Sequence, residues 1–138
     1  MTVTPELLQA SAAHYQSGEL HIEKTALAAI AANVGTPVYV YSDAMLKQQY
    51  RRLDNALGDL PHKLHFAVKA NSTLAVLKVF AELGAGFDIV SGGELSRVIS
   101  AGGDPAAVVF SGVGKSVEEI DFAPVSYTHL TLPTILLV

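Results

Sequence analysis

From Thr36 onward, hydrophobic and polar positions alternate between two periods. Short runs rich in β-branched and aromatic residues are typical of strands, and each is followed by apolar residues at helical spacing. The runs predict strands over 36–42 (TPVYVYS), 63–69 (KLHFAVK), 86–91 (GFDIVS) and 107–112 (AVVFSG). The helical spacing predicts helices over 44–57, 74–83, 93–100 and 116–120. Ser42 or Asp43 can cap the first of these helices, and Ser72 or Thr73 the second.

Strands that alternate with helices at this spacing predict right-handed βα units on a parallel sheet. The runs YVY, FAV and VVF are almost continuously apolar, as in strands that are covered on both faces. A barrel and an open doubly wound sheet both fit this pattern. The first strand is not followed by G-x-G-x-x-G, which weakens the dinucleotide-binding version of the open sheet.

The two ends of the chain differ from this repeat. Around Gly18, the segment HYQSGELHIE alternates apolar and polar residues and predicts a small β element, and 25–34 predicts an alanine-rich helix. No charged residue follows Asp121, and the last residues (PVSYTHLTLPTILLV) contain two prolines where a helix is expected. We expect 124–138 to be a non-native tail of read-through sequence; the alternative is a native edge strand, TILLV.

Length sets a limit on the architecture. An eight-unit barrel takes about 250 residues, whereas this chain of 138 residues holds about four βα units. The sequence therefore predicts an N-terminal fragment with three segments. These segments are an N-terminal β segment and helix (1–35), a partial βα barrel (36–123) and the tail (124–138).

Composition narrows the function. The net charge is −4 without any basic run, so neither nucleic acid nor an anionic membrane is an expected partner. The chain lacks cysteine, which excludes disulfides and thiolate metal sites. The first residues have neither the basic nor the apolar region of a secretory signal, and no apolar run reaches the about 20 residues of a membrane span. We therefore expect a cytoplasmic protein.

Functional groups gather at the carboxyl ends of the strands in parallel βα folds. Lys69 ends the second predicted strand, where a desolvated amine can act as a nucleophile that forms a Schiff base with a carbonyl compound. The alternative is a lysine whose amine simply reaches solvent. The same reasoning selects three further seams. They are Tyr41-Ser42-Asp43, Asp88 with Ser91-Gly92-Gly93-Glu94, and Ser111 to Lys115.

These other seams are more ambiguous. Asp88 could face the mouth of the sheet or pair with a lysine, and Glu94 could be an ordinary acid of a first helical turn. The glycines before Glu94 could form an anion-binding nest or a tight connection. The run around Ser111 is not a phosphate-binding P-loop, because Ala107 stands where its first glycine should be. The five histidines show no metal spacing, and His65 is expected in the core.

In order and spacing, the runs TPVYVYS, FAVKAN, GFDIVSGGEL and VVFSGVGKS resemble diaminopimelate decarboxylase, of the pyridoxal-phosphate decarboxylases with an alanine-racemase-like barrel. The resemblance extends from about His14 to Phe122, and the stretch Phe66–Asn71 is its most specific part. It implies a (β/α)8 TIM-type barrel, pyridoxal 5'-phosphate as cofactor, and decarboxylation of meso-2,6-diaminopimelate to L-lysine. In this resemblance Lys69 is the catalytic residue that binds the cofactor, Asp88 lines the cofactor pocket, and Ser111 lies at the pocket mouth.

The resemblance also implies parts that this chain lacks. The family has a later histidine on the cofactor ring, glycine-rich phosphate loops, a glutamate at the pyridine nitrogen, and a cysteine and a tyrosine completed across a homodimer. GELHIE would join a missing β domain and so lack a strand partner. We therefore expect the chain alone to be inactive. The alternatives are a decarboxylase for ornithine or arginine, and a non-catalytic pyridoxal-phosphate-binding regulator.

Overall fold

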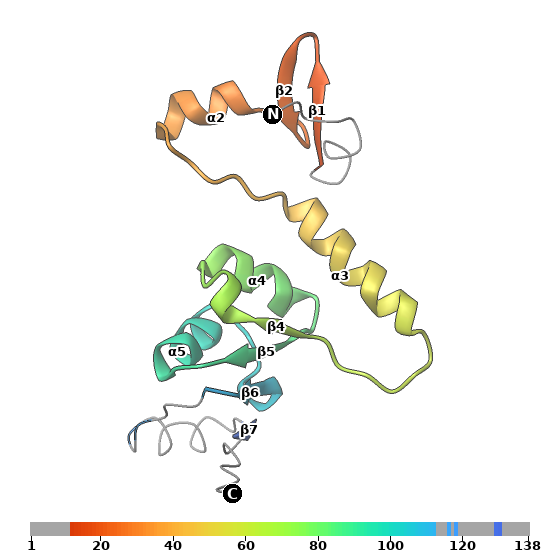
Figure 1. The fold of residues 1–138 in the computed structure, drawn as a ribbon, viewed down its shortest axis with the longest axis vertical. Helices are drawn as coiled ribbons and strands as arrows, with labels where there is room; N and C mark the ends of the chain where they lie inside the picture. The colour runs from red at the N-terminus through yellow and green to blue at the C-terminus, as the bar shows by residue number, and fades with distance from the viewer. Residues whose placement is uncertain (1–11, 113–115, 117, 119–128, 131–138) are drawn as a thin grey trace, which may run out of the picture. The chain divides into compact units, whose positions relative to one another are not determined.

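The computed structural model describes residues 12–112, 116, 118, 129 and 130 of the chain (Figure 1). The chain forms two compact units, Met1–Leu53 and Asp54–Val138. The expected domain boundaries near 35 and 123 stay predictions. No helix in the described part of the chain is both long and apolar enough to cross a membrane.

The first unit contains a three-stranded antiparallel sheet in the order β1-β2-β3. Its strands are β1 (Ala13–Gln16), β2 (Glu19–Ile22) and β3 (Thr25–Ala26). Ser17 and Gly18 turn the chain between the first two strands with φ of 52° and 84°, a left-handed conformation that glycine adopts without strain. The predicted β element is therefore confirmed. The expectation that GELHIE lacks a strand partner is wrong, because this tight turn brings β1 onto β2 and β3 covers its other edge.

Two helices follow in the chain, α2 (Leu27–Val34) and α3 (Asp43–Leu57). The helix α2 ends at Gly35, whose N–H donates to the carbonyl of Ala31 at 2.9 Å. Both predicted helices are confirmed, although the first begins two residues late because Thr25 and Ala26 pair with β2. None of the described side chains on α3 is fully buried.

The strand predicted over 36–42 is wrong. The described residues of this segment form no strand and join neither sheet. Tyr39 is 88% exposed, and Val38 and Tyr41 are also exposed, so this apolar run is not covered on both faces as expected. Strand propensity reflects packing against neighbouring strands, and this segment has no strand beside it to supply that packing.

The second unit contains a parallel sheet in the order β4-β5-β6-β7. Helices α4 and α5 follow its first two strands and pack against each other (Figure 1). Short 3₁₀ turns, η1 and η2, connect some of these elements. The strands are β4 (His65–Ala67), β5 (Gly86–Ile89), β6 (Val108–Phe110) and β7 (His129–Leu130). The helical elements are η1 (Val68–Ala70), α4 (Leu74–Glu82), α5 (Gly92–Ser100) and η2 (Pro105–Ala107).

The core of this unit lies between the sheet and the two helices. Phe87 and Ile89 on β5 are fully buried, as expected for a strand covered on both faces. The ring of Phe66 stacks on that of Phe80, with centroids 4.1 Å apart. The buried face of α4 differs by register from the prediction, because Leu74 is 44% exposed and Val76 takes its place. The fully buried large side chains are Phe87, Phe110, Leu77, Ile89, Leu95, Val68, Val98 and Val108.

Parts of the C-terminal prediction lie outside the described residues. The fourth predicted helix is described only at Ser116 and Glu118, and the alternative edge strand TILLV is not described. Within the predicted tail, His129 and Leu130 form β7, which pairs in parallel with Val109 and Phe110 of β6. The origin of the tail stays a prediction.

Candidate functional site

The candidate site lies at the carboxyl ends of β4, β5 and β6. These strands are parallel neighbours, and Ala67, Asp88 and Val109 lie side by side in the register. Lys69 follows Ala67 by two residues, and Ser111 follows Val109 by two residues. The fold thus brings Lys69, Asp88 and Ser111 to the same edge of the sheet, as the sequence predicts.

Lys69 lies in η1, one turn beyond the end of the strand. The predicted strand is therefore two residues too long at this end, because the chain turns into a 3₁₀ conformation at Val68. Val68 is fully buried, while Lys69 is exposed. Among the described residues, the amine of Lys69 makes no hydrogen bond or ion pair. Lys69 thus carries an accessible primary amine on a turn that a buried side chain anchors.

The residues after Lys69 are held by hydrogen bonds. The backbone N–H of Asn71 donates to the carbonyl of Val68 at 3.1 Å. The side-chain oxygen of Asn71 accepts from the N–H of Thr73 at 2.9 Å, just before α4 begins. The predicted role of this asparagine in starting the helix is confirmed. Thr73 is the N-cap residue, but its own side chain makes no capping bond.

Asp88 and Ser111 contact each other directly. Asp88 is half-buried on β5, and one oxygen of its carboxylate accepts a hydrogen bond from the hydroxyl of Ser111. The backbone N–H of Ser111 donates to the carbonyl of Ile89 at 3.0 Å, which continues the pairing of the two strands. The carboxylate is thereby oriented by a group on the neighbouring strand, and no lysine pairs with it among the described residues.

Glu94 has a structural role at the start of α5. Ser91 caps this helix, with its hydroxyl accepting from the N–H of Glu94 at 3.2 Å. The carboxylate of Glu94 accepts from the N–H of Val90 at 2.8 Å. These reciprocal bonds resemble a capping box, so the chain connects β5 tightly to α5. The S-x-x-E spacing at 91–94 is the sequence signal that identifies this arrangement.

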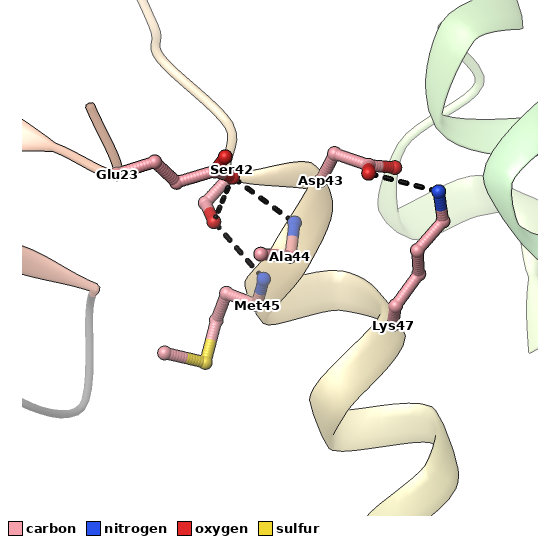
Figure 2. Close-up of polar contacts among 6 residues, drawn as sticks. All are labelled: Glu23, Ser42, Asp43, Ala44, Met45 and Lys47. Atoms are coloured by element: carbon pink, nitrogen blue, oxygen red, sulfur yellow. Dashed lines mark hydrogen bonds and ion pairs between the residues drawn. The ribbon is translucent and has the colours of Figure 1, made fainter. Parts of the chain in front are cut away.

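The remaining seam lies in the first unit (Figure 2). Ser42 caps α3, because its hydroxyl oxygen accepts from the N–H of Met45 at 3.0 Å. Glu23, which precedes β3, accepts from the Ser42 hydroxyl at 2.7 Å and from the N–H of Ala44 at 3.0 Å. These two bonds lower the pKa of the Glu23 carboxyl, the bond from Ser42 most strongly. This seam therefore stabilises a helix start, and Asp43 pairs with Lys47 at 2.8 Å.

The histidines serve local contacts. His62 accepts or donates at 2.7 Å to the carbonyl of Leu60 and lies 3.0 Å from Asp54, and both contacts raise its imidazole pKa, the first more. The expectation that His65 lies in the core is wrong, because His65 is exposed and its ring lies over Gly86. Within the described part of the chain, no three His, Asp or Glu side chains form a group that could hold a metal ion.

Two long-range contacts were missed by reasoning from the sequence. Glu23 reaches a helix that starts 20 residues later, and Arg97 of α5 donates from Nε to the carbonyl of Ser72 at 2.8 Å. Neither contact has a signal in local spacing, because each joins segments that only the fold brings together. The second of them touches the segment that carries Lys69.

Comparison with known proteins places the chain in a family. Residues 43–131 match the family described as pyridoxal-dependent decarboxylase, pyridoxal binding domain. Over 107 residues the chain is 59% identical to diaminopimelate decarboxylase from Pseudomonas fluorescens, which covers 78% of this chain and 26% of that protein. The chain thus spans about a quarter of the length of this curated relative.

Solved structures give the same result. A crystal structure from Aquifex aeolicus matches with a TM-score of 0.77 and 42% identity, covering 84% of this chain and 29% of that one. Diaminopimelate decarboxylase from Helicobacter pylori, complexed with L-lysine, matches with a TM-score of 0.74 and 35% identity, covering 78% and 28%. These neighbours confirm the predicted partial barrel over the open sheet. The chain therefore belongs to the pyridoxal-dependent decarboxylases and matches their pyridoxal-binding domain.

Proposed function

We propose that the protein to which this chain belongs decarboxylates meso-2,6-diaminopimelate to L-lysine and carbon dioxide. The observation that carries this proposal is the 59% identity to a diaminopimelate decarboxylase over most of the chain. The structural neighbour that is complexed with L-lysine supports a product of this class. Ornithine and arginine are not favoured as substrates, because the lysine/ornithine decarboxylase among the solved neighbours is only 25% identical.

The donor set at the sheet edge fits pyridoxal phosphate. The aldehyde of this cofactor requires a primary amine, and Lys69 supplies an exposed one at the carboxyl end of β4. Asp88 and Ser111 add a carboxylate and a hydroxyl on the two neighbouring strands. We therefore propose Lys69, Asp88 and Ser111 as the residues of this chain that hold the cofactor.

Each of these residues has a separate task in the proposal. When bound, pyridoxal phosphate supplies an electron-accepting ring for the loss of carbon dioxide from the amino acid. Lys69 binds the aldehyde carbon through Nζ, and the same atom can later carry a proton back to the substrate. Asp88 orients polar groups near Lys69, and Ser111 holds the Asp88 carboxylate in place.

The proposal extends to the whole protein. We propose that the full gene product is a cytoplasmic homodimer, and that the 138-residue chain alone does not turn over substrate. The family's later histidine, glutamate, cysteine and tyrosine would have to come from further sequence. Light scattering of the full gene product measures the dimer directly, and a monomer that is active would contradict this part of the proposal.

Release of carbon dioxide from labelled substrates tests the reaction. The full gene product is incubated with pyridoxal phosphate and, separately, with meso-diaminopimelate, ornithine or arginine. We expect release from diaminopimelate alone, and none from any substrate with Lys69→Ala. Release from ornithine or arginine would replace the substrate, whereas cofactor binding without any release would indicate a non-catalytic regulator.

A further inference from the structure

The segment Val68–Thr73 carries Lys69 between two fixed elements. On its N-terminal side, β4 pairs with β5, and Val68 is fully buried. On its C-terminal side, the bonds of Asn71 described above are local and lie within the segment itself. Local bonds define the shape of a turn, but they do not determine where the turn lies relative to the sheet. A contact from another element is needed for that.

Arg97 supplies such a contact from α5. Its Nε atom donates to the carbonyl oxygen of Ser72 at 2.8 Å, although the two residues are 25 positions apart. The helix α5 starts directly after β5, the strand that carries Asp88. Arg97 therefore ties the segment that follows β4 to the helix that follows β5, at the sheet edge where the candidate site lies.

We propose that Arg97 is a positioning residue for Lys69. By holding the Ser72 carbonyl, it limits the movement of the Lys69 turn relative to β5, and so it places the lysine amine for attack on the cofactor aldehyde. This inference rests on the proposed function, since it assumes that Lys69 binds pyridoxal phosphate. Arg97 acts through the backbone and needs no contact with cofactor or substrate.

The chemistry of the contact favours arginine. A guanidinium is always charged, and a hydrogen bond from a charged donor is stronger than one between neutral groups. The planar guanidinium also holds its N–H directions rigidly, whereas a lysine ammonium is a mobile point charge. Lysine at position 97 keeps a donor on a long stem, so it is expected to restore part of the contact.

Hydrogen exchange tests the contact without cofactor. The full gene product is compared with its Arg97→Ala variant, and the exchange rates of the amides of residues 71–74 are measured. Lys78→Ala is the matched control, because it removes an exposed positive charge from the neighbouring helix α4. We expect about tenfold faster exchange in 71–74 with Arg97→Ala, as for the loss of about 1.4 kcal/mol. Exchange at the control rate would overturn the role of Arg97 in ordering the segment.

Selective labelling tests the consequence for Lys69. The same proteins are treated with pyridoxal phosphate, reduced with borohydride and digested, and the pyridoxyl group is counted on each lysine by mass spectrometry. We expect Arg97→Ala to lower the preference for Lys69 over other lysines about tenfold at unchanged melting temperature. A merely structural role would lower the melting temperature and leave this preference intact. Arg97→Lys is expected to recover part of the preference, and no recovery would count against the hydrogen bond as the cause.

The outcomes separate the two proposals. If the parent protein shows no preference for Lys69, the proposed function fails, and hydrogen exchange still decides whether Arg97 orders the segment. If the parent labels Lys69 selectively and Arg97→Ala does so equally, only the positioning role of Arg97 is overturned.

Discussion

Ser111 donates a hydrogen bond to the carboxylate of Asp88 across the ends of two neighbouring parallel strands. Both residues were predicted from the sequence to lie at the site, but their direct contact was not. The bond makes the two side chains an energetic pair, so removal of one should change the effect of removing the other.

A double-mutant cycle with Ser111→Ala and Asp88→Asn measures this pair. Because Ser111 is exposed, we expect a coupling of about 1 kcal/mol in the free energy of unfolding, determined from urea titrations. Ser96→Ala replaces Ser111→Ala in the matched control, since the Ser96 hydroxyl donates within its own helix to the carbonyl of Gly92. Equal coupling in both cycles would show that the Ser111 bond contributes nothing specific.

Glu23 makes the stability of the first unit depend on pH. Hydrogen bonds from Ser42 and Ala44 hold the pKa of its carboxyl below the ordinary value of 4.5. A lowered pKa in the folded state means that this contribution is complete above 4.5 and is lost as the pH falls through the folded pKa. Glu23→Gln is therefore expected to lower the free energy of unfolding at neutral pH, by an amount that shrinks below pH 4.5.

Urea unfolding at several pH values, followed by circular dichroism, tests this prediction. Glu19→Gln is the matched control, because Glu19 is also exposed and lies on the same sheet but makes no such contacts. The control should leave the free energy of unfolding at neutral pH nearly unchanged. A Glu23→Gln difference that stays constant from neutral to acid pH would contradict the account.

His62 gives the opposite pH dependence in the second unit. The carbonyl of Leu60 and the carboxylate of Asp54 raise the pKa of its imidazole above 6.5. The stabilisation is therefore complete below 6.5 and is lost as the pH rises through the folded pKa. In an NMR titration, Asp54→Asn should lower the pKa of His62, although the Leu60 carbonyl still favours the charged form. Asp59→Asn is the control, and an equal shift there would indicate general charge effects instead of the Asp54 contact.

Gly112 permits a close approach of two backbone segments after β6. A Cβ atom at this position would lie 2.6 Å from the carbonyl oxygen of Val90, which backbone cannot easily avoid. We expect Gly112→Ala to lower the free energy of unfolding by about 1–3 kcal/mol, as for overpacking of a core. Gly93→Ala is the control, since its Cβ would meet nothing closer than 3.8 Å. Equal stability of the two variants in urea would contradict the close approach.

The sequence predicted elements best where local chemistry decides the structure. Ser91 caps α5, and the order of strands and helices from β4 to β6 follows directly from apolar periodicity. The segment 36–42 shows the limit, because its apolar residues have strand propensity but the described structure supplies no neighbouring strand. A pattern reports what a segment can do, whereas pairing depends on the rest of the fold.

The candidate site divides in the same way. The positions of Lys69, Asp88 and Ser111 at one edge follow from parallel pairing, because all three come directly after or near the end of a predicted strand. The partners that hold them do not follow from spacing. Arg97 reaches Ser72 only because α4 and α5 pack together, and this packing appears only in the folded chain.

Peptide mapping of the cofactor attachment site tests the central claim most directly. The full gene product is loaded with pyridoxal phosphate, reduced with borohydride and digested, and Lys69→Ala is treated in parallel. We predict one dominant pyridoxyl group, on the peptide that contains Lys69, and its loss in the variant without transfer to another lysine. Stoichiometric attachment in a folded Lys69→Ala protein, or attachment spread evenly over the lysines of the parent, would contradict the assignment of Lys69.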